Sequence, residues 1–195
     1  MFVIITKNIK KSKSLTWNLY VQHYTWYNIF GDNMKKEVKT NVMRILDQKH
    51  IEYTVHDYSD TDMISGLDVA NVLNQDPKVV FKTLVTIGKS NNYYVFLVPV
   101  SNNLDLKKAA KSVNEKSIEM IKSKDLLGLT GYIHGGCSPV GMKKFFKTTI
   151  DISAKNNDKI YFSAGKIGYQ IETTLEELSK VIKYNLDDIS EDKHV

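Results

Sequence analysis

The chain has 195 residues, of which 42% are hydrophobic and 25% charged, and this composition is typical of a globular domain rather than of a low-complexity or disordered chain. Its single cysteine, Cys137, excludes an intramolecular disulfide and a cysteine-rich metal site and favours a reducing, cytoplasmic location. The net charge of +5 is too diffuse to predict DNA binding, and no apolar run reaches the roughly 18 residues of a membrane span.

The first 33 residues differ in character from the rest. They hold both tryptophans, Trp17 and Trp26, and residues 14–31 contain no Asp, Glu, Lys or Arg. No small-residue cleavage site follows, so a signal peptide is not indicated. Met34 opens a clear periodic pattern, and we interpret residues 1–33 as a loosely ordered extension that arises from an upstream start, with an amphipathic anchor as the alternative.

Three elements are predicted next. Apolar residues at i, i+4, i+7 and i+8 predict a helix over 35–49. Alternating apolar and polar residues predict a half-buried strand over 51–56, followed by a polar loop over 57–62. Ser65 is a candidate N-cap for a short helix over 66–73.

Two runs rich in β-branched and aromatic residues, 79–87 and 93–100, predict a hairpin of core strands. Further along the chain we expect a helix over 104–113, a strand near 118–121, a helical turn capped by Ser123, and strands at 132–134, 148–152, 160–163 and 169–172. Thr174 and Glu177 form a capping-box pattern for a last helix whose apolar face reaches Ile182. The order of elements predicts a single α+β domain, with a frayed acidic end over 187–195.

The stretch from Thr130 to Gly141 is the most unusual part of the sequence. Gly135 and Gly136 can adopt positive φ, and Pro139 fixes the exit of the loop. We expect the amides of residues 136–138 to point one way, as suits a carbonyl oxygen, an oxyanion or a phosphate. A wide turn without a ligand is an equal alternative.

Two further side chains could carry chemistry. Cys137 with His134 as its base would be a thiol nucleophile, but known local signatures of cysteine hydrolases are absent and a structural cysteine is favoured. Lys82 interrupts an apolar strand and must reach solvent, an acid or an anionic ligand. The histidines are scattered and the glycine pairs lack a phosphate-loop lysine, so neither a metal nor a nucleotide cofactor is predicted.

Several segments together resemble the YbaK/EbsC-type aminoacyl-tRNA deacylases, relatives of the editing domain of bacterial prolyl-tRNA synthetases. The matching segments, in family order between residues 35 and 189, are 79–84, 98–100, 104–110, 130–132, 135–141, 149–151 and 160–168. The resemblance implies a domain over 34–189 with a mixed, mostly antiparallel, barrel-like sheet flanked by helices, followed by an acidic tail over 190–195. It also implies clearance of wrongly charged tRNA, most typically cysteine on the proline tRNA and also Cys-tRNA(Cys).

The resemblance implies roles for particular residues as well. Lys82 would contact the tRNA acceptor end, and Gly135 would act with it in catalysis. The remaining implied substrate-binding residues are Tyr58, Thr83, Gly136, Cys137, Ser138, Pro139, Ser163, Gly165 and Gln170. The family is thought to use the thiol of the bound cysteine instead of a protein nucleophile, which agrees with an incidental Cys137, and prolyl-tRNA synthetase is an implied partner.

Two departures from the family pattern bear on specificity. Gln170 stands where the family often has an acid, and Ser65 stands where an aromatic residue is common. Loss of a carboxylate would change how an α-amino group is held. A non-catalytic module that senses an amino acid or a charged tRNA is therefore the alternative to a deacylase.

Overall fold

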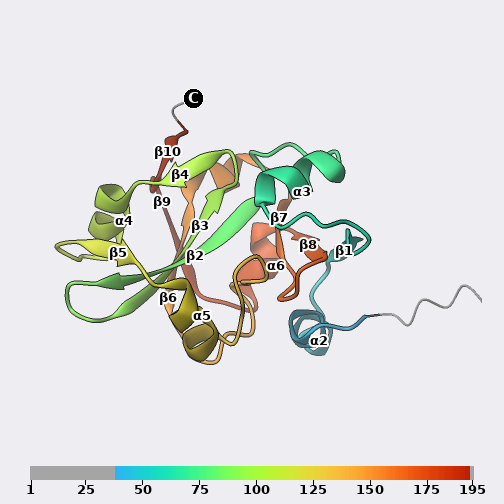
Figure 1. The fold of residues 1–195 in the computed structure, drawn as a ribbon, viewed down its shortest axis with the longest axis horizontal. Coiled ribbons are helices and arrows are strands. Elements are labelled where there is room, and N and C mark those ends of the chain that lie inside the picture. The colour runs from blue at the N-terminus through green and yellow to red at the C-terminus, as the bar shows by residue number, and fades with distance from the viewer. Residues whose placement is uncertain (1–37, 194–195) are drawn as a thin grey trace, which may run out of the picture. The chain divides into compact units, whose positions relative to one another are not determined.

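A hairpin of strands β2 (Phe81–Gly88) and β3 (Tyr93–Pro99) lies at the centre of the computed structural model, which describes residues 38–193 (Figure 1). The predicted hairpin is thereby confirmed. Strand β5 (Ile118–Met120) adds to the outer edge of β2, while β6 (Lys147–Asp151) and β9 (Tyr184–Asp187) continue the sheet beyond β3 in the order β5-β2-β3-β6-β9. The β3–β6 and β6–β9 pairings are parallel.

Two smaller sheets flank the central one. Strands β1 (Thr54–Asp57), β8 (Tyr169–Thr173) and β7 (Ile160–Ser163) form an antiparallel sheet in the order β1-β8-β7. Strand β4 (Asn102–Leu104) pairs antiparallel with β10 (Ser190–Asp192). The predicted α+β class with mostly antiparallel pairing is confirmed, although the strands of residues 38–193 are divided among three sheets and no closed barrel is formed.

Five α-helices and one 3-10 helix connect these strands within the described residues. They are α2 (Asn41–Gln48), α3 (Gly66–Val72), α4 (Leu106–Ser112), α5 (Ser123–Thr130), η1 (Ile152–Asn156) and α6 (Leu175–Ser179). Side chains of Thr40, Ser65, Asp105 and Thr174 accept backbone hydrogen bonds at their N-termini, which satisfies amides that helix geometry leaves unpaired. None of these helices is long and apolar enough to cross a membrane.

One hydrophobic core cluster lies between β3 and α4. Its buried members are Tyr94, Phe96, Val98, Ala109, Ala110, Val113, Ile118 and Ile189. The small alanines let α4 approach the aromatic side chains of β3 closely, and Ile189 closes the cluster from the C-terminal segment. The chain from Lys39 onward forms one unit, whereas the predicted extension 1–33 lies outside the described residues.

Some predicted boundaries differ from the structure. Helix α2 begins at Asn41 because Thr40 caps it, not at residue 35. The strand expected at 51–56 lies at 54–57, where Val55 is 40% exposed. Lys122, not Ser123, is the N-cap of α5. The strand expected at 132–134 does not form, because Gly131 (φ 86°) ends α5 and the chain turns away.

The C-terminal end is more ordered than expected. The prediction of a frayed segment over 187–195 is wrong for residues 187–192, because β10 pairs with β4 and Ile189 is fully buried. Helix α6 also ends at Ser179, before Ile182. Thr174 caps it as predicted, but the Glu177 carboxylate accepts from the backbone of Glu52 instead of completing the capping box.

Candidate active site

A pocket of about 330 Å³ lies along an open edge of β2. Strand β5 pairs only with Thr86–Gly88, so residues 81–84 of β2 have a strand partner on the β3 side alone. The lining includes seven of the predicted site residues: Tyr58, Lys82, Thr83, Gly135, Cys137, Ser163 and Gln170. Segments that are far apart in the sequence therefore meet at this edge.

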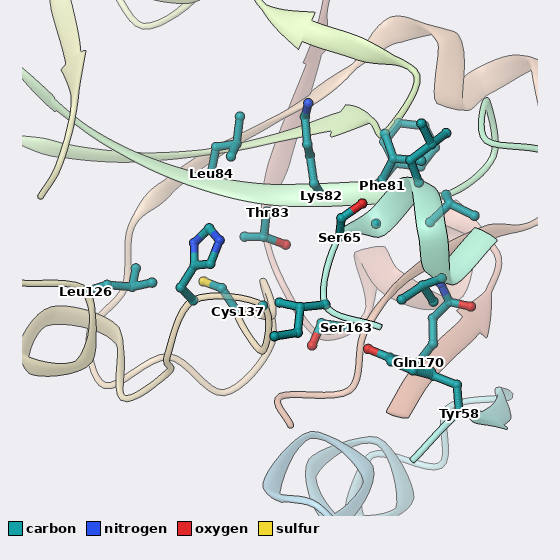
Figure 2. A pocket seen from close by; sticks show the side chains of 18 of the residues that line it. Tyr58, Ser65, Phe81, Lys82, Thr83, Leu84, Leu126, Cys137, Ser163 and Gln170 are labelled. Carbon is teal, nitrogen blue, oxygen red and sulfur yellow. The ribbon is translucent and has the colours of Figure 1, made fainter. Parts of the chain in front are cut away.

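Side chains of both faces of β2 reach the pocket because its edge is open. Figure 2 shows Thr83 on the same side of the strand as Cys137 and Ser163, whereas Lys82 and Leu84 leave β2 on the other side. The alternation of side chains along β2 produces this division. The pocket thus has a cationic side and a neutral polar side.

The cationic side holds Lys82 and a second lysine, Lys193. The Lys82 Nζ donates to the carbonyl oxygen of Asn102 at 2.6 Å, and the Lys193 Nζ donates to the carbonyl oxygen of Val100 at 2.7 Å. Burial, and then the nearby charge of Lys193, lower the pKa of Lys82 to about 8. Lys82 is therefore still mostly charged at neutral pH.

The neutral side contains buried oxygen atoms without a partner. Thr83 Oγ1 and Gln170 Oε1 have no hydrogen-bond partner among residues 38–193, and Gln170 is only 4% exposed. Burial raises the pKa of the Tyr58 hydroxyl, which keeps it neutral. Buried polar atoms in folded proteins are nearly always paired, so unpaired ones on a pocket wall are suited to a polar ligand.

The glycine loop lies beside these groups. Gly135 has φ 81°, and a Cβ atom there would come within 2.7 Å of Ile64 Cγ2, so only glycine fits this position. The Gly136 N–H donates to the carbonyl of Ile133 at 3.0 Å, which corrects the expectation that the amides of residues 136–138 are all free. The N–H groups of Cys137 and Ser138 have no acceptor among residues 38–193.

Four predicted site residues do not line the pocket: Gly136, Ser138, Pro139 and Gly165. Ser138 is fully buried, and its Oγ accepts from the backbone N–H of Val140 within the same turn. Gly165 (φ 85°) would place a Cβ atom within 2.8 Å of the Tyr132 ring, so it lets the two glycine loops pack together. These four residues lie outside the lining of the pocket, in the segments that contribute Gly135, Cys137 and Ser163 to it.

Cys137 reaches the pocket as a neutral thiol. It is 8% exposed, and burial raises its pKa to about 12. His134 also lines the pocket, but the side chain that is hydrogen-bonded to the Cys137 thiol is that of Thr130. A nucleophilic cysteine needs a lowered pKa and a base in contact, so this arrangement favours the incidental reading of Cys137.

The described residues contain no cluster of three or more His, Cys, Asp or Glu side chains placed to hold a metal ion. The functional groups of the pocket are instead ammonium groups, backbone amides, and neutral hydroxyl and amide side chains. Such groups can bind an anion and orient an ester, and they supply charge stabilisation rather than a nucleophile.

Comparison with known proteins identifies the family. The model of the aminoacyl-tRNA editing domain matches residues 65–181, which include β2, the glycine loop and β8. The chain belongs to the aminoacyl-tRNA editing domain family. One relative of this editing domain, provisionally named Cys-tRNA(Pro)/Cys-tRNA(Cys) deacylase EbsC, from Enterococcus faecalis, is 42% identical over 145 residues, 74% of this chain and 88% of the relative.

Solved structures show the same fold. The hypothetical protein APE2540 aligns with a TM-score of 0.72 at 18% identity over 78% of this chain and 100% of its own. A protein provisionally described as a trans-editing enzyme for prolyl-tRNA synthetase aligns with a TM-score of 0.67 at 22% identity, over 79% of this chain and 99% of its own. At these identities the likeness concerns the fold of the editing domain alone.

The sequence did not indicate every residue of the pocket. Ile64, Leu126 and Val100 are ordinary apolar residues, and their positions in the sequence carry no signal. Ser65 was noted as a cap and His134 as a base, and both lie on the wall. Lys193 lies in the acidic segment that was expected to fray, so only the pairing of β10 with β4 could have indicated it.

Proposed function

We propose that this editing domain acts in trans as a deacylase of mischarged tRNA and that cysteine on the proline tRNA is its preferred substrate. The observation that carries the proposal is the pocket at the open edge of β2, where Lys82, the Gly135 loop and the unpaired oxygens of Thr83 and Gln170 converge. The name of the 42% identical EbsC supports the choice of amino acid and tRNA.

Each group of the pocket is suited to a different part of the substrate. The Lys82 ammonium is suited to the phosphate or ribose of the tRNA end, because it is a cation whose protein partner is a single carbonyl. The unpaired Cys137 N–H is suited to the ester carbonyl oxygen, where negative charge develops. Gln170 Oε1, which has no hydrogen-bond partner among residues 38–193, can accept a hydrogen bond from the α-amino group.

The nucleophile in this proposal is the thiol of the substrate. Its sulfur forms a bond to the ester carbonyl carbon, the bond from that carbon to the ribose oxygen breaks, and the thiol proton ends on the ribose oxygen. Free tRNA leaves, and water then opens the cyclic thioester to cysteine. The raised pKa of Cys137 supports this route, since the protein's own thiol stays protonated.

Prolyl-tRNA synthetase would supply the substrate, because an enzyme that mischarges tRNA(Pro) with cysteine releases it in the cytoplasm. The structural likeness to a protein described as its trans-editing enzyme supports this partner. The cationic side of the pocket and the net charge of +5 are compatible with an RNA end as the ligand.

The test compares three esters of one tRNA with the full chain. Cys-tRNA(Pro) should be deacylated rapidly, whereas Pro-tRNA(Pro) and 2-aminobutyryl-tRNA(Pro) should persist, because a methyl group replaces the thiol in the latter. Equal release of cysteine and 2-aminobutyrate would refute the substrate-thiol step. Binding of charged tRNA without release of any amino acid would instead establish a sensing module, and the Lys82→Ala protein serves as the activity control.

A further inference from the structure

Lys193 reaches the pocket from the C-terminal strand, far from Lys82 in the sequence. Pairing of β10 with β4 places Asp192 opposite Asn102, so the next residue lies beside the chain reversal that follows β3. The two lysines donate to the carbonyl oxygens of residues 100 and 102. These residues are two apart in the chain, and their Cα atoms are therefore no more than about 7 Å apart. Both lysines line the same pocket, and the charge of Lys193 acts on Lys82.

This pair of cations has no acidic partner. Among residues 38–193, neither Lys82 nor Lys193 forms an ion pair, and each Nζ atom has one protein acceptor. The nearby carboxylate of Asp192 accepts from the Asn102 amide instead. An ammonium has three donors, so each lysine keeps donors for a ligand. Lys82 is partly buried and Lys193 is exposed, and the like charges of the two lysines repel each other unless an anion joins them.

We infer that Lys193 is a second cationic residue of this site and that it binds, together with Lys82, one phosphate group of the tRNA acceptor end. The inference rests on the proposed function for the identity of the RNA. A phosphodiester has two non-bridging oxygens, one for each ammonium. The carboxylate of the amino acid cannot take this place, because it is esterified in the substrate.

The geometry also orients the substrate. Lys82 and Thr83 leave β2 on opposite sides (Figure 2), and both line the same pocket as Gly135. A phosphate held by the two lysines would therefore direct the ester of the terminal nucleotide past the edge of β2 toward Thr83 and Gly135. Lys193 is thus a positioning residue that acts on the nucleic-acid part of the substrate. Its loss should weaken binding more than it slows the chemical step.

The experiment measures binding of a dinucleotide, cytidylyl-3′,5′-adenosine, which carries one phosphodiester and no amino acid. We expect Lys193→Met to raise its Kd about tenfold, as loss of a hydrogen bond to a charged group predicts. Lys193→Arg should recover part of the affinity because the charge is retained. The matched control is Lys155→Met, which removes the same charge from an exposed position in η1 and should leave the Kd unchanged.

A combined variant shows whether one phosphate joins both lysines. If it does, Lys82→Ala with Lys193→Met should weaken binding by less than the product of the single effects. With Cys-tRNA(Pro), Lys193→Met should raise KM about tenfold and leave kcat within twofold. The slope of log KM against log salt should also decrease by about 0.7, the value for one lost phosphate contact with a single strand.

Three outcomes would overturn the inference. They are no dinucleotide binding by the unaltered protein, an unchanged Kd for Lys193→Met, and a lowered melting temperature as the only effect of that variant. The last outcome would mean that Lys193 merely holds the Val100 carbonyl. Dinucleotide binding requires no hydrolysis. The binding result can therefore be interpreted even if the deacylase proposal fails.

Discussion

Burial favours the neutral forms of both Lys82 and Cys137. At neutral pH, however, Lys82 stays mostly charged, whereas the thiol of Cys137 is neutral. The pKa of Lys82 falls to about 8, so the side chain stays mostly cationic below that pH. The pKa of Cys137 rises to about 12, so its thiol stays protonated. The same desolvation therefore leaves the pocket with a usable cation and without a protein nucleophile.

The pH dependence of deacylation follows from the lowered pKa of Lys82. The ammonium is present below about pH 8 and is lost as the pH rises through that value, so kcat/KM should fall on the alkaline side. The other titratable groups on the pocket wall are Lys193, His134, Tyr58 and Cys137. Initial rates from pH 6 to 10, corrected for spontaneous ester hydrolysis, would measure this decline.

Two variants test whether Lys82, and not another group of the pocket, causes the alkaline decline of kcat/KM. Lys82→Arg keeps its charge over the whole range and should remove the decline, although its larger fork should lower the maximal rate. Lys193→Met should move the decline to higher pH, because one cause of the lowered pKa is removed. An unaltered decline in Lys82→Arg would assign it to another group.

Cys137→Ala should keep the deacylase activity within about twofold. The reacting thiol belongs to the substrate in the proposed route, and the thiol of Cys137 is protonated and lacks a contacting base. The measurement is kcat/KM on Cys-tRNA(Pro), with the melting temperature as the control for folding, because removing a buried thiol costs packing. A folded but inactive variant would point to a protein nucleophile.

At the scale of elements, local patterns predicted what local interactions decide. Strands β2, β3, β7 and β8 follow from β-branched and aromatic runs, and α3 follows from the Ser65 cap. The expected strand at 132–134 does not form because Gly131 ends α5 in the left-handed conformation and tertiary contacts hold the segment that follows. The Tyr132 hydroxyl donates to the Val140 carbonyl and its ring packs on Gly165, contacts that no alternation of residues encodes.

The candidate site was accessible to sequence only through several short motifs taken together. Each motif alone suited an ordinary turn or strand, whereas their family order indicated one pocket, and seven of the expected residues line it. Lys193 could not be found in this way. Its place depends on the pairing of two three-residue strands, β4 and β10, which are too short to give a periodic signal.

Glu172 ties β1, β8 and the segment before β7 together. Its carboxylate accepts from His56 Nε2 at 2.6 Å and pairs with Lys159, and its side chain is 10% exposed. Burial acts to raise the pKa of Glu172, but the contacts with Lys159 and His56 outweigh burial and hold this pKa below its ordinary value. These contacts stabilise the fold while the carboxylate is charged.

The lowered pKa of Glu172 determines how its contribution to the free energy of unfolding changes with pH. A carboxyl with a lowered pKa in the folded state adds stability above its unfolded pKa of about 4.3, and that stability is lost as the pH falls through the folded value. Glu172→Gln should therefore lower the free energy of unfolding at pH 7 and make it less sensitive to acid. Urea unfolding at pH 7 and pH 3.5 would measure both effects, and equal losses at the two pH values would contradict this assignment.

On the scale of the whole molecule, we expect removal of the N-terminal and C-terminal segments to have different effects on stability and activity. All described elements and all pocket residues follow Val38. Deletion of residues 1–33 should leave both the melting temperature and kcat/KM on Cys-tRNA(Pro) unchanged. An earlier melting transition, or a loss of activity without one, would assign these residues to the core or to the substrate site.

The C-terminal segment should prove indispensable, and two truncations distinguish its two contributions. Ending the chain after Asp187 removes Ile189, which is fully buried against the core and whose N–H donates to Asp151 Oδ2 at 3.2 Å. The loss of a buried isoleucine alone costs about 2–5 kcal/mol, so this protein should melt well below the full chain or fail to fold.

Ending the chain after Asp192 keeps β10 and Ile189 but removes Lys193. Its melting temperature should stay within a few degrees, while its affinity for cytidylyl-3′,5′-adenosine should fall as in Lys193→Met. If both truncations melted alike and bound the dinucleotide like the full chain, the C-terminal segment would contribute neither to the core nor to the cationic side of the pocket.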